Sequence, residues 1–264
     1  FKQVALNWLE QEHDWCISRQ TWWGIEIPVY YGTGDRADEV LVAKSEEEAE
    51  KHFGAGQFKK ETDTFDTWFS SGQWPFATLM NTQPGDFETF YPTTLMATAR
   101  EILHKWVTRM IMFGLFKTNH VPFTEVYLWG IVTDEEGQKM SKSKGNVIDP
   151  LVLTEKYGTD ALRLTAALTN TPGNDSPLGE NKVLPQRNFC NKLWNISNYI
   201  GGLADKQISE SPELHSKSSA DDWMLHQIKV KSSVIGDKIE RYRLNEAAHE
   251  LYHLIWSDFA DWYL

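Results

Sequence analysis

The stretch that decides the fold reads Gly137-Gln138-Lys139-Met140-Ser141-Lys142-Ser143-Lys144-Gly145-Asn146. It places three lysines in ten residues of a chain whose formal net charge is -11. The glycines near its two ends let the backbone bend. Lys139 and Lys142 can meet phosphates as point charges, and Ser141 and Ser143 add short donors. Such a loop could stabilise the charge that develops on a leaving pyrophosphate. Taken alone, the same residues also fit a solvated basic turn.

The sequence around this loop favours a phosphate-binding loop over a solvated turn. Residues Lys139 to Ser143 read KMSKS and continue with Gly145-Asn146. In this the chain resembles the class I aminoacyl-tRNA synthetases, whose second ATP-binding signature has the same form. Four further phrases resemble the valine-specific members of that family: DWCISRQTWWG (14–24), DTWFSSGQWPF (66–76), RMIMFG (109–114) and RNFCNKLWN (187–195).

The resemblance implies an α/β fold in which the C-terminal half of a class I Rossmann catalytic domain precedes an α-helical bundle, the anticodon-binding domain. It implies a catalytic half over 1–135, the KMSKS loop and stem-contact segment over 136–175, and the start of the helical domain over 176–264. None of the eight histidines lies in the H-x-G-H phrase of the family, and both ends of the chain look cut. We therefore expect a fragment without the N-terminal half and the editing domain, inactive on its own.

The activity implied is ATP-dependent activation of valine to valyl-adenylate and its transfer to tRNA(Val), with Mg²⁺ accompanying the nucleotide. The resemblance assigns catalysis to Lys139 and Lys142. The same two lysines and five neighbours are assigned to ATP binding: Ser141, Ser143, Gly130, Ile131 and Val132. Four residues are assigned to the amino-acid pocket: Trp68, Glu101, Ile102 and Trp106. The family usually has aspartate where Glu101 stands.

Two rival functions stay open at this point. An isoleucyl- or leucyl-type synthetase has a similar loop and helical domain, although the isoleucyl pattern has an aspartate at the position of Ser70. A non-catalytic, synthetase-derived tRNA-binding module is the rival from another class, because the H-x-G-H half is missing.

Composition indicates the fold class, the cellular location and the kinds of partner to expect. The chain has 264 residues, 41% of them hydrophobic, and 12 tryptophans, which suffices for a buried core. Cys16 and Cys190 stand far apart, so we predict neither structural zinc nor any other metal site in this segment, and a reducing, cytoplasmic location. No apolar run approaches the ~20 residues of a membrane span. The acidic balance argues against a general nucleic-acid coat, but a tRNA needs only a local basic track, so the net charge excludes little. We expect neither a membrane nor a DNA partner.

Hydrophobic spacing predicts the elements of the first half of the chain. We expect a helix over 1–12 followed by a buried run at 15–17, and a strand that buries Ile25, Ile27, Val29 and Tyr31 on one face. The remaining expectations are a returning strand over 40–43, a helix with a Ser45/Glu48 capping box, a strand over 64–69, a helix over 100–113 that ends at Gly114, and a central parallel strand over 126–132.

In the second half of the chain, the residues that begin and end helices are easier to identify. Asp134 to Gly137 should form a turn, and Asp149-Pro150 should begin a helix that Gly158 ends. A long helix should stop at Gly201-Gly202, before a linker over 206–218. Ser219 with Asp222, and Asn245, are expected to cap two further amphipathic helices, which predicts a helical bundle.

Overall fold

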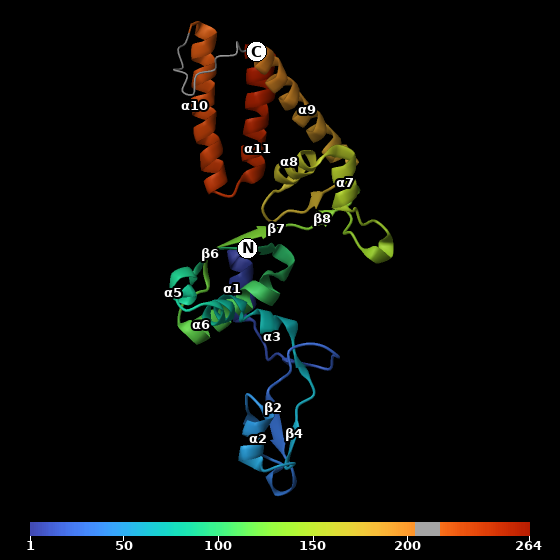
Figure 1. Ribbon diagram of the computed structural model, residues 1–264, viewed down its shortest axis with the longest axis vertical. Helices are drawn as coiled ribbons and strands as arrows, with labels where there is room; N and C mark the ends of the chain where they lie inside the picture. Colours follow the sequence, from blue (N-terminus) through green and yellow to red (C-terminus); the bar gives the residue numbers. More distant parts are fainter. Residues whose placement is uncertain (204–216) are drawn as a thin grey trace. The chain divides into compact units, whose positions relative to one another are not determined.

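The computed structural model describes residues 1–203 and 217–264. It divides into two compact units, residues 1–96 with 101–126 and residues 97–100 with 127–264, and each is described by itself (Figure 1). The predicted linker over 206–218 lies almost entirely outside the described residues. Within the described ranges, none of the helices is both long and apolar enough to cross a bilayer.

The first unit combines short strands with helices, and two of its strands, β6 and β7, end in residues of the second unit. Its elements in chain order are α1 (Lys2–Glu10), β1 (Ser18–Arg19), β2 (Val29–Gly32), η1 (Gly34–Arg36), β3 (Val40–Val42), α2 (Glu46–Phe53), β4 (Phe58–Lys60), β5 (Thr64–Phe65), α3 (Thr67–Ser71), α4 (Trp74–Thr82), α5 (Asp86–Phe90), β6 (Thr93–Ala99), η2 (Arg100–Ile102), η3 (Leu103–Val107), α6 (Thr108–Thr118) and β7 (Phe123–Trp129).

Strands β3, β2 and β4 form an antiparallel sheet in that order, which confirms the predicted returning strand. The predicted buried face was wrong. Tyr30 is buried in a cluster with Ala43, Ala49 and Phe53, whereas Tyr31 is exposed. Helix α2 covers the Tyr30 face of the sheet and so decides which alternate residues are buried, because a shift of one residue exchanges the two faces of a strand. In Figure 1, α2 lies beside β2 and β4.

The first turn of α2 differs from the predicted capping box. The helix does follow Ser45, but no side-chain cap bond forms from that serine. The Glu48 carboxylate instead accepts a hydrogen bond from the backbone N–H of Lys44, at 2.9 Å. Upstream, the predicted buried run at 15–17 was also wrong, since Cys16 is exposed.

The predicted strand over 64–69 ends after two residues and gives way to helix α3. Asp66 explains the change, because its carboxylate accepts the backbone N–H of Trp68 at 2.8 Å and so caps the helix. Asp66 is buried and pairs with Arg19 at 2.7 Å. Trp68 and the two serines after it therefore lie on a helix.

The helical region after residue 100 is longer than predicted. A 3₁₀ turn, a π-helical turn and the α-helix α6 follow one another without a break. Gly114 lies inside α6, and the helix ends at Asn119, which has a φ of 59°. Gly114 is required by packing, since a Cβ there would come within 2.9 Å of the Tyr91 hydroxyl and 3.0 Å of Pro122 Cδ.

This contact predicts opposite effects for one substitution at two helical glycines. Gly114→Ala should lower the melting temperature, because overpacking by about 1–3 kcal/mol outweighs the gain of about 1 kcal/mol in helix propensity. Gly201→Ala should leave it unchanged or raise it, because nothing lies within 4 Å of a Cβ at that position. Thermal unfolding followed by circular dichroism measures both. Equal shifts for the two variants would contradict the packing role of Gly114.

The second unit carries the signature loop and the helices that follow it. Its further elements are β8 (Val132–Thr133), η4 (Lys142–Lys144), α7 (Pro150–Tyr157), α8 (Thr159–Thr169), β9 (Ser176–Pro177), α9 (Glu180–Leu203), α10 (Ser219–Glu240), α11 (Leu244–His253) and the π-helical η5 (Leu254–Tyr263). Strands β8 and β9 pair in parallel, with Val132 opposite Ser176.

The predicted central strand over 126–132 was wrong in position and burial. Strand β7 begins at Phe123 and pairs with β6 in a two-stranded sheet of the described residues, and it buries only Phe123 and Leu128. Val126 and Trp129 are exposed. The apolar run is therefore divided between two strands, with Gly130 and Ile131 between them.

Helix boundaries in this unit follow the sequence signals in part. Asp149 caps α7 by accepting the Leu151 N–H at 2.9 Å, and Gly158 ends it with a φ of 91°, both as predicted. Helix α9 continues through Gly201-Gly202, whose backbone a helix tolerates at a cost of about 1 kcal/mol per glycine. Ser218 caps α10 in place of Ser219, and Asn245 lies within α11.

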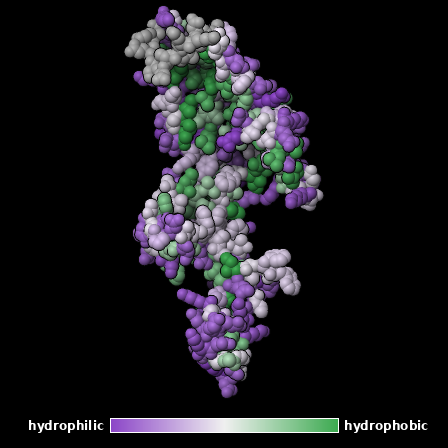
Figure 2. Space-filling view, in the orientation of Figure 1, coloured by the Kyte–Doolittle hydropathy of each residue, from purple (hydrophilic) through white to green (hydrophobic). Residues whose placement is uncertain are grey.

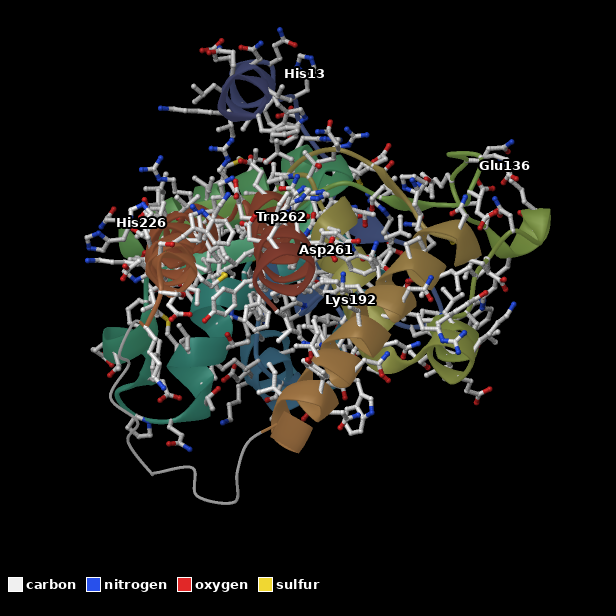
Figure 3. The ribbon with its side chains drawn as sticks, turned by 90° about the horizontal axis from the view of Figure 1, so that it is seen from above. His13, Glu136, Lys192, His226, Asp261 and Trp262 are labelled. Carbon is white, nitrogen blue, oxygen red and sulfur yellow. The ribbon has the colours of Figure 1, made fainter. Side chains whose placement is uncertain are left out.

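The predicted helical bundle is confirmed, since α8 packs on both α9 and α11, and α11 packs on α10. Phe189 of α9 stacks on Tyr252 of α11, with ring centroids 4.6 Å apart. Lys192 pairs with Asp261 at 2.7 Å (Figure 3). Its ammonium group also lies 3.8 Å from the ring centroid of Trp256. Figure 2 shows hydrophobic residues, in green, along these helices, whereas the surface around α2 and β4 is mostly hydrophilic.

Candidate active site

The signature loop leaves the end of β8 and returns close to its starting point. Asp134 is buried directly after β8, and its backbone exchanges hydrogen bonds with Gln138 and Gly137 around the predicted turn. Its carboxylate accepts the N–H of Gln138 at 2.6 Å and the side-chain amide of Asn146 at 2.7 Å. The Asn146 hydrogen bond is the main cause of the lowered pKa of Asp134, which keeps this carboxylate ionised.

Within the loop, Ser141 to Lys144 form one tight turn. Ser141 caps the 3₁₀ turn Lys142–Lys144 by accepting the Lys144 N–H at 3.3 Å, and its hydroxyl lies 3.3 Å from that of Ser143. Lys139, Lys142 and Lys144 are all exposed. The structure therefore presents three ammonium groups and two neighbouring hydroxyls on one loop, a set that suits a polyphosphate.

The predicted adenine segment, Gly130 to Val132, is held by residues 173–176 of the same unit. The backbone N–H of Ile131 donates to Asp175 Oδ1 at 2.8 Å, and its carbonyl accepts the N–H of Ser176 at 3.0 Å. A Cβ on Gly130 would lie 1.8 Å from the carbonyl oxygen of Asn174, so only glycine permits this approach.

Both backbone polar groups of Ile131 are thus already bonded within the protein. A cavity of about 280 Å³ adjoins this segment, and its lining includes Trp129, Gly130, Val132, Leu162 and Ala166. Gly130 and Val132 therefore have an open surface beside them, whereas Ile131 does not line the cavity.

The residues predicted for the amino-acid pocket lie in the first unit and are only partly brought together. Trp106 Nε1 donates to the Ser71 carbonyl at 3.0 Å, and the Trp106 ring lies 6.4 Å from that of Trp74. Both tryptophans line a cavity of about 640 Å³ together with Ser70 and Ser71. Trp68, Glu101 and Ile102 are not part of its lining: Trp68 and Ile102 are half-buried elsewhere, and Glu101 is exposed.

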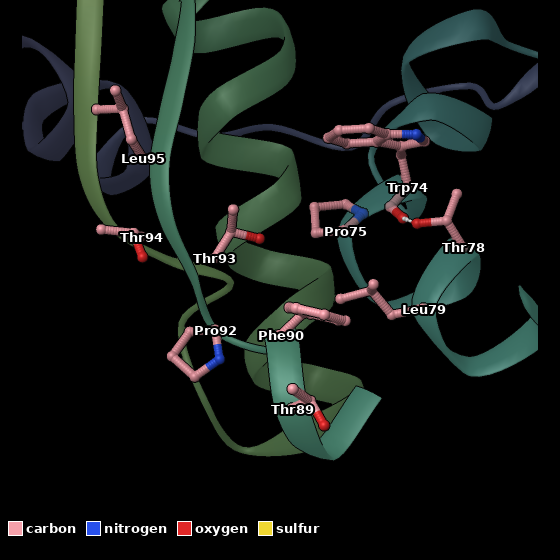
Figure 4. Close-up of a pocket in the computed structure, with 10 residues that line it drawn as sticks. All are labelled: Trp74, Pro75, Thr78, Leu79, Thr89, Phe90, Pro92, Thr93, Thr94 and Leu95. Atoms are coloured by element: carbon pink, nitrogen blue, oxygen red, sulfur yellow. Dashed lines mark hydrogen bonds between the residues drawn. The ribbon is translucent and has the colours of Figure 1, made fainter. Parts of the chain in front are cut away.

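A second cavity in this unit, of about 400 Å³, lies between α4 and the start of β6 (Figure 4). Helix α4 contributes Trp74, Pro75 and Leu79 to its lining, and Phe90, Pro92 and Thr93 come from the end of α5 and the segment that leads into β6. It contains none of the predicted site residues. Over the described part of the chain, there is no group of three or more His, Cys, Asp or Glu residues that could hold a metal ion.

Sequence reasoning missed the side chains that hold the site in place. Asp175 accepts from Ile131 and also from the Arg100 guanidinium at 2.8 Å, and Arg100 donates further to the Gly173 carbonyl at 2.7 Å. Asp134 was predicted as a turn residue only, and Asn146 as the end of a signature. The one available signal was the acidic residue ahead of a lysine-rich loop, which gave no indication of its partners.

Comparison with known proteins agrees with these features. Residues 1–177 match the family described as tRNA synthetases class I (I, L, M and V), and residues 221–264 match the anticodon-binding domain of tRNA ligase. The first match covers more than half of the chain. The chain therefore belongs to the class I tRNA synthetases of this group.

Several relatives are named valine--tRNA ligase. That of Geobacter sulfurreducens is 43% identical over 269 residues, and that of Dehalococcoides mccartyi strain CBDB1 is 43% identical over 267 residues. Each alignment covers 100% of this chain and 30% of the relative, so the chain spans about a third of the length of these curated relatives.

Solved structures share the fold. The LeuRS of Agrobacterium radiobacter K84 in its ternary complex with tRNA and LeuAMS matches 94% of this chain and 36% of its own, with a TM-score of 0.72 and 20% identity. Methionyl-tRNA synthetase of Mycobacterium tuberculosis with methionyl-adenylate matches 96% and 45%, with a TM-score of 0.71 and 16% identity. The predicted combination of a class I catalytic domain and an anticodon-binding domain is confirmed.

Proposed function

We propose that this chain is part of a valine--tRNA ligase, which activates valine with ATP and transfers it to tRNA(Val) in the cytoplasm. The observation that carries this proposal is the agreement of two features. Relatives with this name match the whole chain at 40–43% identity, and the two lysines of the KMSKS residues, Lys139 and Lys142, are exposed on the loop that follows β8.

The proposed reaction needs positioning and charge more than a protein nucleophile. The valine carboxylate attacks the α-phosphate of ATP, and the bond to pyrophosphate breaks. Lys139 and Lys142 stabilise the negative charge that grows on the leaving pyrophosphate, with Ser141 and Ser143 as additional donors. A terminal ribose hydroxyl of the tRNA then takes the valyl group and AMP leaves.

The remaining site residues have supporting roles in this proposal. Gly130, Ile131 and Val132 contact the adenine, and the cavity beside Gly130 and Val132 supports a contact there. We assign Trp68, Glu101, Ile102 and Trp106 to the valine site, and of these four Trp106 is the one that lines the cavity of about 640 Å³. We propose the same functional division as from the sequence, with residues 1–135, 136–175 and 176–264 serving catalysis, loop and stem contact, and anticodon binding.

Magnesium enters this proposal with the nucleotide. Mg²⁺ usually binds through substrate phosphates and one or two carboxylates, and it keeps several waters. The phosphates of ATP would therefore supply much of its coordination, while the lysines of the loop neutralise the remaining charge.

The first test is valine-dependent exchange of pyrophosphate into ATP by the full-length protein, with isoleucine and leucine assayed alongside. Exchange should be fastest with valine. A preference for isoleucine or leucine would replace the proposed substrate, and no exchange with any amino acid would favour the non-catalytic tRNA-binding module.

A second assay concerns the 264-residue chain on its own. It should show no valine-dependent exchange above background, because the H-x-G-H half of the ATP site is not among its residues. The full-length protein in the same assay is the positive control, and circular dichroism checks that the isolated chain is folded. Exchange by the folded chain at a rate near that of the full-length protein would show that the ATP site lies within these residues.

A further inference from the structure

Two side chains join the base of the signature loop. Asp134 stands before the KMSKS residues and Asn146 after them, and Asn146 Nδ2 donates to Asp134 Oδ2 at 2.7 Å. Asp134 is buried and Asn146 is half-buried, although the lysines between them are exposed. We call this pair the Asp134–Asn146 clasp.

Asn146 also contacts the backbone of the signature itself. Its Oδ1 accepts the N–H of Ser141 at 2.9 Å, and its Nδ2 donates a longer bond of 3.3 Å to the carbonyl of Lys139. A carboxylate can only accept, so the amide nitrogen must face Asp134, and this leaves the amide oxygen for Ser141. One side chain thereby fixes the backbone on both sides of Met140.

Asp134 fixes Asn146 in turn. Its carboxylate is held between the Asn146 amide and the N–H of Gln138, so it orients Asn146 and closes the turn before Lys139 at the same time. Hydrogen bonds to an ionised acceptor are about twice as strong as neutral ones. The lowered pKa of Asp134 means that the clasp keeps its charge across the neutral range.

We propose that Asn146, oriented by Asp134, is a positioning residue that sets the backbone of residues 139–144 so that Lys139 and Lys142 meet the phosphates of ATP. This inference deepens the proposed function and rests on it. The clasp itself touches neither nucleotide nor valine in the proposal. It acts through the loop backbone, where a misplacement of about 1 Å can cost 100-fold in rate.

The test uses the full-length protein and four variants. Asn146→Ala removes the amide, Asp134→Ala removes its partner, and a double variant carries both changes. Glu136→Ala is the matched control, because it removes one carboxylate from the same loop at an exposed position.

Limited trypsin digestion provides the first measurement, since trypsin cuts after Lys139, Lys142 and Lys144. Cleavage at these sites, followed by mass spectrometry, should be on the order of tenfold faster in Asn146→Ala and Asp134→Ala, because proteolysis follows the population of open loop. The Glu136→Ala protein should be cut like the wild type. Unchanged cleavage in Asn146→Ala would overturn the clasp.

Exchange kinetics provide the second measurement. For Asn146→Ala and Asp134→Ala we expect kcat to fall about 10- to 100-fold, with the KM for valine changed less than about threefold. The double variant should be no slower than the slower single variant, because both changes break one unit. The positioning role would be overturned if the two single-variant losses in kcat multiplied in the double variant, or if Asn146→Ala kept the wild-type kcat. A wild-type protein without any exchange would overturn the proposed function and this role with it, while trypsin cleavage still reports on the clasp.

Discussion

Lys142→Ala in the full-length protein is expected to slow valyl-adenylate formation by about 100- to 1,000-fold, the usual cost of removing one group that stabilises developing charge. Lys142 lies in the 3₁₀ turn that Ser141 caps, so its backbone position is fixed while its ammonium group is exposed. The charge on pyrophosphate grows as the bond to the α-phosphate breaks. The effect should therefore fall on kcat, with the KM for valine changed only a few-fold.

Lys144→Ala is the matched control for this result. It removes the same charge from the same turn, two residues further on and outside KMSKS, and its side chain is also exposed. We expect less than about a threefold change, the size of a general electrostatic effect on an exposed loop. Single-turnover formation of the adenylate at saturating valine and ATP measures both variants. Equal losses for the two lysines would reduce the loop to a diffuse basic patch.

Sequence reasoning placed the elements best where a local hydrogen bond decides them. Asp149 and Pro150 begin α7 and Gly158 ends it, because a side-chain cap, a fixed proline φ and a left-handed glycine act within a few residues of one another. The same reasoning misplaced the cap of α10 by one residue, from Ser218 to Ser219. Adjacent serines can both cap, and only the packed helix distinguishes them.

Errors were larger where tertiary packing decides. The alternation in β2 was visible in the sequence, but the choice of buried face depends on α2, which lies further along the chain. Gly114 looked like a helix end because its close neighbours, Tyr91 and Pro122, are contributed by other segments. Asp66 turned a β-prone run into a helix by a cap bond that its β-branched and aromatic neighbours concealed.

For the site, the sequence predicted the charged groups and not what holds them. Lysines and serines in a short motif have a direct chemical meaning, so the KMSKS loop could be predicted from spacing and resemblance. What holds the site depends on pairs that only the folded chain brings together. Arg100 and Asp175 are far apart in sequence, and Asp134 reaches Asn146 across the loop. A single sequence contains no signal for such pairs.

The amino-acid pocket leads to the second large effect. Trp106 is half-buried, hydrogen-bonded to the Ser71 carbonyl, and faces a cavity of about 640 Å³. If it bounds the valine side chain, Trp106→Leu opens space beside the two methyl groups and should admit isoleucine. One methylene is worth about 1–3 kcal/mol in such a pocket, so the kcat/KM ratio for adenylate formation should move toward isoleucine by about one to two orders of magnitude.

The alternative role of Trp106 is packing against Trp74, whose ring centroid is 6.4 Å away. In that case Trp106→Leu should lower the melting temperature and reduce activation of both amino acids by the same factor. Trp194→Leu is the control for loss of an indole, since Trp194 is 70% exposed on α9, and it should change neither the ratio nor the melting temperature. Activation of valine and isoleucine, measured side by side with a melting curve on each preparation, separates the two roles. An unchanged kcat/KM ratio of isoleucine to valine with a lower melting temperature would remove Trp106 from the pocket. A packing residue affects both substrates alike, whereas a residue that lines the pocket distinguishes them by the one methylene in which they differ.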